Sequence, residues 1–102
     1  MKRKSGTKAN GQAFSEEILK EIFSRGEVVE DMREELWRRD TSGLLMYYPN
    51  YGDAKSSFGW VVDHIIPVIH GGGDRIDNLQ PLNIRTNKKK GESLTWVKKP
   101  RY

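Results

Sequence analysis

The sequence predicts a small domain of the α+β class, in which helices precede a strand–loop–strand–helix unit. Apolar residues recur at helical spacing near the N-terminus, whereas two short apolar runs, 58–66 and 79–82, are typical of strands. A helical pattern of about three turns begins at Ile84. The 102 residues suffice for one domain with a modest core, because a chain of this size buries only about two-thirds of the surface that it exposes when unfolded.

The N-terminal part of the chain is expected to form a flexible arm followed by helices. Residues 1–13 contain four basic residues and almost no apolar side chains, which is typical of a flexible arm. A helix is predicted to begin at Ser15, a favourable N-cap, and to end at Gly26. A second helix is predicted from Asp31 onward, because a glutamate three residues later completes a capping box. We therefore expect residues 14–40 to form a helical segment packed on the core.

Residues 41–102 are expected to hold the functional core and a basic tail. The run 44–48 predicts one strand and the run 58–66 a second. A loop with three consecutive glycines then leads to a short strand over 79–82. The tail, residues 96–102, is basic, and its proline argues against a helix there.

The charge is distributed unevenly along the chain, whose net charge is +4. Residues 1–8 carry four basic residues, and residues 84–102 carry seven against Glu92 alone, for +6. Residues 9–83 carry seven basic and thirteen acidic residues, for −6. A basic end on an acidic body favours a polyanionic partner that docks on one side. The alternative is that the lysine-rich termini only keep the protein soluble.

Several functional classes are disfavoured by what the sequence lacks. There is no cysteine, which excludes disulfides, thiolate zinc sites and thiol nucleophiles, so we expect no structural zinc. No apolar run approaches the roughly 20 residues that a membrane span requires. The basic N-terminus is not followed by the apolar stretch of a secretory signal. We therefore expect no membrane partner and a cytoplasmic location.

The candidate catalytic and metal-binding residues lie in the segment GWVVDHIIPVIHGGGDRIDNLQPLNIRTNKKKG, residues 59–91. Asp63 and His64 end a predicted strand beside the glycine-rich loop. Asn78 follows 14 residues after His64, and Asn87 follows 23 residues after it, in the first turns of the predicted helix. A strand, a loop, a strand and a helix in so few residues should bring the side chains at positions 63, 64 and 87 into one cleft.

This segment resembles the HNH motif of the ββα-metal nucleases over about a third of the chain. It shares a D-H-x-x-P start, a glycine-rich loop, an N-L-Q-x-L middle and a final N-x-x-K-G. His64 matches the first His of the motif, Asn78 the central Asn, and Asn87 the terminal His or Asn. Both spacings are also similar to those in the HNH domain of RNA-guided DNA nucleases. The resemblance implies a ββα-metal core, in which two short antiparallel strands and a helix surround one metal site.

The chemistry of phosphodiester hydrolysis fits these residue types. His64 is a candidate general base, because a neutral imidazole can take a proton from water near neutral pH. Asp63 and Asn87 offer oxygen ligands to one divalent cation; Mg²⁺ is the expected ion and Mn²⁺ the alternative. The resemblance implies that Asn78 joins the catalytic set in a structural role, holding the loop so that a backbone carbonyl orients the His64 ring.

Four basic residues next to these positions are candidates for nucleic-acid binding. Beside a phosphate-cleaving site, they are expected to contact the sugar–phosphate backbone. The alternative is a solvated helix face. The four residues are Arg85, Lys88, Lys89 and Lys90.

Together these features predict a metal-dependent endonuclease that acts on DNA. RNA stays open as a substrate, because phosphate contacts do not read sequence. A non-catalytic nucleic-acid-binding module on the same scaffold is one alternative. A toxin domain controlled by an inhibitor protein is another. Oligomeric state, including a homodimer that cuts both strands, and sequence specificity stay open.

Overall fold

The structure, a computed structural model, describes residues 3–93 and contains two α-helices, three short 3-10 helices and two antiparallel sheets in this range. One sheet has the strand order β1-β2-β3, and the other pairs β4 with β5. The predicted α+β class is confirmed, whereas the predicted basic tail, residues 96–102, lies outside the described residues. The elements are α1 (Glu16–Phe23), β1 (Glu27–Val28), β2 (Trp37–Arg39), β3 (Leu45–Tyr47), β4 (Trp60–His64), β5 (Leu79–Asn83) and α2 (Ile84–Lys90).

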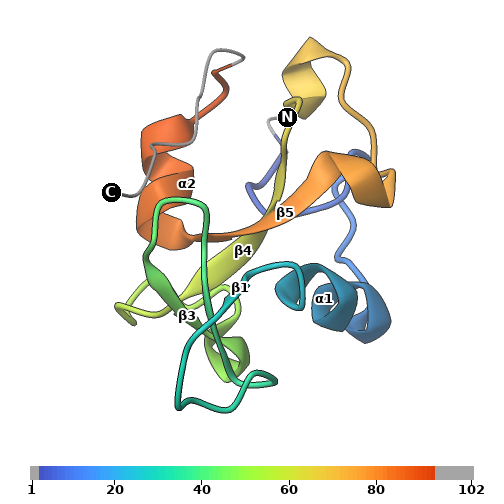
Figure 1. Ribbon diagram of the computed structural model, residues 1–102. Helices are drawn as coiled ribbons and strands as arrows, with labels where there is room; N and C mark the ends of the chain where they lie inside the picture. The colour runs from blue at the N-terminus through green and yellow to red at the C-terminus, as the bar shows by residue number, and fades with distance from the viewer. Residues whose placement is uncertain (1–2, 94–102) are drawn as a thin grey trace.

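The β4–β5 hairpin lies at the centre of the fold, with α1 and α2 on opposite sides of it (Figure 1). All five residues of β4 are buried. A short, fully buried strand reads as a continuous apolar run rather than as an alternating pattern, which is how β4 reads up to Asp63. The register pairs Trp60 with Asn83 at one end and His64 with Leu79 at the other. The strand therefore carries its two polar residues to the end that borders the glycine-rich loop.

An aromatic cluster fixes the beginning of β4 against the N-terminal half of the chain. The fully buried ring of Trp60 lies 4.9 Å from that of Phe23, 5.0 Å from Tyr51 and 5.7 Å from Tyr48, measured between centroids. The indole N–H donates to the carbonyl of Tyr48 at 3.0 Å. Each such aromatic pair adds about 0.5–1.5 kcal/mol beyond the area that it buries.

Helix α1 forms as the sequence predicts, although it is shorter. The Ser15 hydroxyl accepts from the N–H of Ile18 at 3.3 Å and caps the helix. The buried face consists of Leu19, Ile22 and Phe23. The helix ends at Phe23 and not at the predicted Gly26.

The predicted second helix, from Asp31 onward, is wrong. The segment contains turns and the strand β2, and Asp31 has a left-handed backbone with φ of 67°. The ring of Trp37 packs on Tyr47 of β3 at 4.6 Å and on Phe58 at 5.1 Å. These cross-strand contacts outweigh the weak local preference that a capping box provides. Residues 14–40 therefore hold one helix and two strands instead of two helices.

Two buried polar side chains connect the three-stranded sheet to the beginning of α2. Asp40 is 2% exposed, and its carboxylate accepts from the backbone N–H groups of Leu44 and Asn83, both at 3.0 Å. Asn83 donates to the carbonyl of Leu45 at 2.9 Å. The Asn83 side chain also accepts from the N–H of Arg85 at 2.9 Å, which caps α2. The position of α2 is thus set by residues far away in the sequence.

The flexibility of the N-terminal arm stays a prediction, but the arm makes specific contacts with the core, and its Gly6 is buried. The hydroxyl of Tyr51 donates to the carbonyl of Gly6 at 3.1 Å. Gly6 has a φ of 84°, a backbone conformation that glycine adopts far more readily than other residues.

Helix α2 has seven residues, fewer than the predicted three turns, and ends before Gly91. Neither this helix nor any other in residues 3–93 combines the length and apolar character needed to cross a membrane.

Candidate active site

A cleft of about 420 Å³ lies where β4, α2 and the N-terminal arm meet. The three residues that the sequence places together, Asp63, His64 and Asn87, all border it. The first two come from the end of β4 and the third from α2. The other residues that border the cleft are Arg3, Ser5, Gly6, Val61, Val62, Pro67, Ile84, Lys88, Lys90, Gly91 and Glu92.

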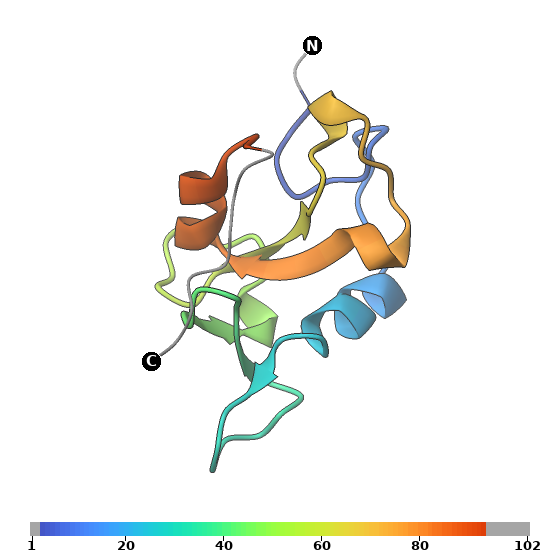
Figure 2. The same ribbon diagram turned by 45° about the horizontal axis from the view of Figure 1, so that its top comes forward.

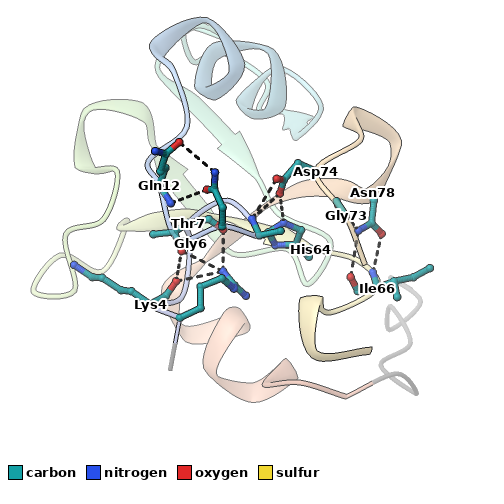
Figure 3. Close-up of polar contacts among 12 residues, drawn as sticks. Lys4, Gly6, Thr7, Gln12, His64, Ile66, Gly73, Asp74 and Asn78 are labelled. Atoms are coloured by element: carbon teal, nitrogen blue, oxygen red, sulfur yellow. Dashed lines mark hydrogen bonds and ion pairs between the residues drawn. The ribbon is translucent and has the colours of Figure 1, made fainter. Parts of the chain in front are cut away.

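His64 is 4% exposed and is held by a carboxylate. Its Nε2 atom lies 2.8 Å from Oδ1 of Asp74, which projects from the glycine-rich loop (Figure 3). The ring of Phe14 lies 6.2 Å from the imidazole and adds apolar contact. The imidazole therefore has an acidic hydrogen-bond partner and an aromatic neighbour.

Asp74 is itself oriented by the N-terminal arm. The backbone N–H of Ala9 donates to both carboxylate oxygens, at 2.9 and 3.2 Å. Partial burial by itself raises the pKa of the Asp74 carboxyl. The hydrogen bonds from His64 and Ala9, together with the charges of His64 and Lys8, outweigh this effect and lower that pKa below its usual value. The carboxylate is therefore ionised at neutral pH and acts only as an acceptor.

Sequence reasoning missed Asp74. The resemblance implied that a backbone carbonyl orients the His64 ring, whereas in the structure the ring contacts the Asp74 carboxylate. The available signal was an acidic residue ten positions after His64, directly after three glycines. In the sequence, Asp74 cannot be distinguished from other polar loop residues, because its contact with His64 depends on the conformation of the loop.

Asn78 holds the glycine-rich loop at three points. Its Oδ1 accepts from the N–H of Ile66 at 2.8 Å, and its Nδ2 donates to the carbonyls of Ile66 at 3.2 Å and Gly73 at 2.9 Å (Figure 3). The loop also passes so close to itself that a Cβ atom on Gly72 would lie 1.7 Å from the carbonyl oxygen of Ile66. Only glycine fits there, and the loop that carries Asp74 is thereby fixed in shape.

Asp63 forms a buried ion pair with Lys90. The Nζ atom of Lys90 lies 3.3 Å from Oδ2 of Asp63, and the two side chains are 2% and 8% exposed. Gln80 donates to the same oxygen at 3.0 Å. Burial raises the pKa of the Asp63 carboxyl, and the Gln80 hydrogen bond and the Lys90 charge offset this rise only in part. Lys90 also donates to the carbonyl of His64 at 2.9 Å.

The basic residues of α2 divide into two groups. Arg85, Lys88 and Lys89 are exposed, as expected for residues that meet a polyanion. Lys90 is 3% exposed and points inward to Asp63, which differs from the phosphate-contacting position predicted for it. The spacing along a helix explains the difference, because Lys90 lies one turn after Asn87 and shares its inward face.

Asn87 contacts the N-terminal arm as well as the cleft. Its Nδ2 atom donates to the hydroxyl oxygen of Ser5 at 2.8 Å, although the two residues are 82 positions apart. Nothing in the sequence pattern predicts this pair.

The oxygen donors of the cleft fit a hard divalent cation. Asp63 has a carboxylate and Asn87 a carboxamide, and Gln80 and Lys90 both contact Oδ2 of Asp63. Within residues 3–93, no three His, Asp or Glu side chains are grouped to enclose a metal. Asp63 and Asn87 are therefore two oxygen donors of the kind that hard divalent cations bind, and not a complete set of ligands.

Comparison with known proteins agrees with the geometry. The family model described as HNH endonuclease matches residues 54–93, a range that contains β4, β5 and α2. No curated protein and no solved structure matches the chain. The matched range includes all four of the motif positions, Asp63, His64, Asn78 and Asn87. Residues 54–93, less than half of the chain, are therefore similar to the HNH endonuclease family, in agreement with the motif that the sequence shows.

Proposed function

We propose that the protein is an endonuclease that hydrolyses phosphodiester bonds in DNA, with His64 as its general base. The similarity of residues 54–93 to the HNH endonuclease family indicates nuclease activity on nucleic acid. The observation that supports the finer assignment is the contact of the buried His64 with the partly exposed Asp74, because His64 borders the same cleft as Asp63 and Asn87.

The His64–Asp74 contact supports the assignment of the base to one of the two ring nitrogens. An ionised carboxylate can only accept, so Nε2 of His64 carries the proton in this pair. In the neutral imidazole the lone pair is then on Nδ1, and Nδ1 takes the proton from the attacking water. The Asp74 carboxylate also stabilises the imidazolium that forms when the proton arrives.

Asp63 and Asn87 are proposed to hold one divalent cation, with Mg²⁺ as the expected ion. When bound there, the cation supplies stabilisation of the negative charge that builds up during hydrolysis. Lys90 keeps the carboxylate of Asp63 in place through its ion pair, and Gln80 fixes the same oxygen.

The exposed basic residues of α2 are proposed to contact the DNA backbone. Lys88 borders the cleft, and Lys89 and Arg85 are exposed on the same short helix. Contacts of this type position the phosphate without reading its sequence.

Cleavage of supercoiled plasmid in the presence of Mg²⁺ tests the proposal. Wild-type protein should convert supercoiled plasmid to the nicked form, and EDTA should prevent this. His64→Ala should lower the rate by about 10²- to 10⁴-fold, the usual contribution of a general base. His70→Ala is a matched control, because His70 is exposed in the neighbouring loop. Wild-type rates in His64→Ala would contradict the assignment of the base, and faster cleavage of RNA than of DNA would correct the substrate.

A non-catalytic nucleic-acid-binding module is the second candidate, and the Asp63–Lys90 ion pair is the observation that favours it. A lysine already neutralises the carboxylate that the enzyme hypothesis assigns to the metal. DNA binding that weakens steeply with salt, without cleavage in Mg²⁺ or Mn²⁺, would support this second candidate.

A further inference from the structure

The N-terminal arm, residues 3–13, lies outside the range that matches the HNH endonuclease family and still forms part of the cleft. Figure 2 shows the arm, in blue, running beside the yellow loop that follows β4. Its residues Arg3, Ser5 and Gly6 border the cleft, and the basic residue Lys88 borders it from α2. Basic residues therefore reach the cleft from two segments that are far apart in the sequence.

Contacts with the core keep the beginning of the arm beside the cleft. Tyr51 donates to the carbonyl of Gly6 at 3.1 Å. The side chains of Ser5 and Asn87 lie 2.8 Å apart, which places the arm next to α2. Because Arg3 precedes Ser5 by two residues, its backbone starts from a position that these contacts define.

The guanidinium of Arg3 is held through one of its terminal nitrogens. Nη1 donates to the carbonyl of Thr7 at 2.8 Å, to the hydroxyl of Thr7 at 3.3 Å and to the carbonyl of Lys4 at 3.2 Å (Figure 3). All of these acceptors are neutral, and none of the ion pairs within residues 3–93 includes Arg3. No carboxylate in that range therefore neutralises the charge of Arg3.

The other donors of this guanidinium suit a phosphate group. Nε and Nη2 form one edge of the planar group, and an edge of this kind donates two parallel hydrogen bonds to a phosphate. In the part of the chain that the structure describes, the Arg3 side chain forms its hydrogen bonds through Nη1 alone. A side chain that is already held at one nitrogen also loses less conformational entropy when it binds a ligand.

The charges around the cleft favour an anion next to Arg3. Asp63 and Lys90 neutralise each other in their buried ion pair. Of the other Asp, Glu, Lys and Arg residues in 3–93 that border the cleft, Arg3 and Lys88 are basic and Glu92 is acidic. A DNA strand that enters the cleft would meet one cation from the arm and one from α2.

We infer that Arg3 is a DNA-binding residue of the cleft, whose Nε and Nη2 atoms donate to a backbone phosphate of the bound strand. The inference rests on the proposed function for the class of substrate. It goes beyond that function because it assigns substrate binding to the N-terminal arm, which precedes the matched range, and because it requires no metal ion.

DNA binding, measured without cleavage, tests the inference. The full chain is titrated in EDTA against a short fluorescein-labelled duplex, and fluorescence anisotropy gives the affinity at several salt concentrations. Arg3→Gln should weaken binding by about 10-fold, as expected when hydrogen bonds to a charged group are lost. The slope of the logarithm of the association constant against the logarithm of salt should become shallower by about 1, because one phosphate contact is lost.

Lys4→Gln is the matched control, because Lys4 is the exposed neighbour of Arg3, carries the same charge and is not among the residues that border the cleft. It should bind DNA nearly as the wild type does. Arg3→Lys keeps the charge without the two-donor edge, so it should keep the wild-type salt slope and recover only part of the affinity.

Three results would overturn the inference. Equal losses in Arg3→Gln and Lys4→Gln would mean that only the net charge of the arm matters. A weaker affinity of Arg3→Gln with the wild-type salt slope would mean that Arg3 acts through the conformation of the arm. Wild-type affinity and slope in Arg3→Gln would remove Arg3 from the DNA contacts.

The outcome for Arg3 is distinguishable from the outcome for the enzyme. A wild-type protein that binds DNA in the Arg3-dependent way described, but leaves plasmid intact in Mg²⁺, would refute the proposed endonuclease and keep the inference. A wild-type protein that nicks plasmid while Arg3→Gln binds DNA normally would do the reverse. A wild-type protein that does not bind DNA in EDTA would overturn the inference, whether or not it cleaves plasmid in Mg²⁺.

Discussion

The two sides of the cleft are built in different ways. On the side of β4 and α2, Asp63, His64 and Lys90 are each less than a tenth exposed and contact one another directly. On the side of the arm, Ser5 and Ala9 are exposed and reach the site through single residues. The β4–α2 side is therefore part of the core, and the arm contacts the core from the surface.

Because of this difference, substitutions on the two sides should differ in their effect on the free energy of unfolding. A buried ion pair that loses one partner costs about 3–5 kcal/mol, because the other charge is left without compensation. A typical hydrogen bond contributes only about 0.5–1.5 kcal/mol net. Substitutions on the β4–α2 side should therefore affect folding, whereas substitutions on the arm side should affect the site and leave folding nearly unchanged.

The largest expected effect is on the buried side. Lys90→Met should lower the free energy of unfolding by about 3–5 kcal/mol, because Asp63 keeps its burial and loses its cation. Urea unfolding followed by tryptophan fluorescence measures this change. Lys89→Met is the control, since Lys89 is the exposed neighbour on α2. Equal stabilities of the two variants would show that the two sides of the cleft do not differ in this way.

Asp74→Asn should act on the rate of cleavage more than on folding. The amide loses the charge that holds the Nε2 proton of His64, so the rate should fall by about 10- to 100-fold. Plasmid nicking at saturating Mg²⁺ measures the rate. Asp77→Asn, an exposed carboxylate in the same loop region, should cleave like the wild type. A normal rate in Asp74→Asn would remove Asp74 from the site.

The smallest expected effect is the difference between the pKa values of the Asp63 and Asp74 carboxyls. Burial raises the pKa of Asp63, and the contacts from His64 and Ala9 lower the pKa of Asp74 despite its partial burial. Carbon-detected NMR should therefore find midpoints on opposite sides of the ordinary value of 3.8. Midpoints on the same side would contradict the contrast between the two sides of the cleft.

The signs of the two contributions to stability follow by linkage. The lowered pKa of Asp74 gives stability that is present above the ordinary value and is lost as the pH falls through the folded-state pKa. The raised pKa of Asp63 does the opposite. Its protonated form is favoured in the folded state, so its contribution declines as the pH rises from the ordinary value through the raised one.

Local patterns predicted the elements of the segment that resembles the HNH motif well and the contacts around it poorly. The strands β4 and β5 were predicted from short apolar runs, and the beginning of α2 from helical spacing; both signals depend on neighbours in the sequence. The contact of Ser5 with Asn87 spans most of the chain, and no periodic pattern encodes a pair of that kind. The region around Trp37 was mispredicted for the same reason. A local capping motif predicted a helix there, but the contacts of Trp37 with Tyr47 and Phe58, which are distant in the sequence, stabilise a strand.

The aromatic cluster around Trp60 indicates that residues 54–93 depend on the rest of the chain for their packing. Trp60 belongs to the matched range 54–93, whereas Phe23, Tyr48 and Tyr51, which enclose its ring, all precede that range. The proposed catalytic residues thus lie in one stretch of the chain, and the aromatic residues that pack around Trp60 lie in another. Moving the segment into a different protein would require a host that offers Trp60 an equivalent set of rings.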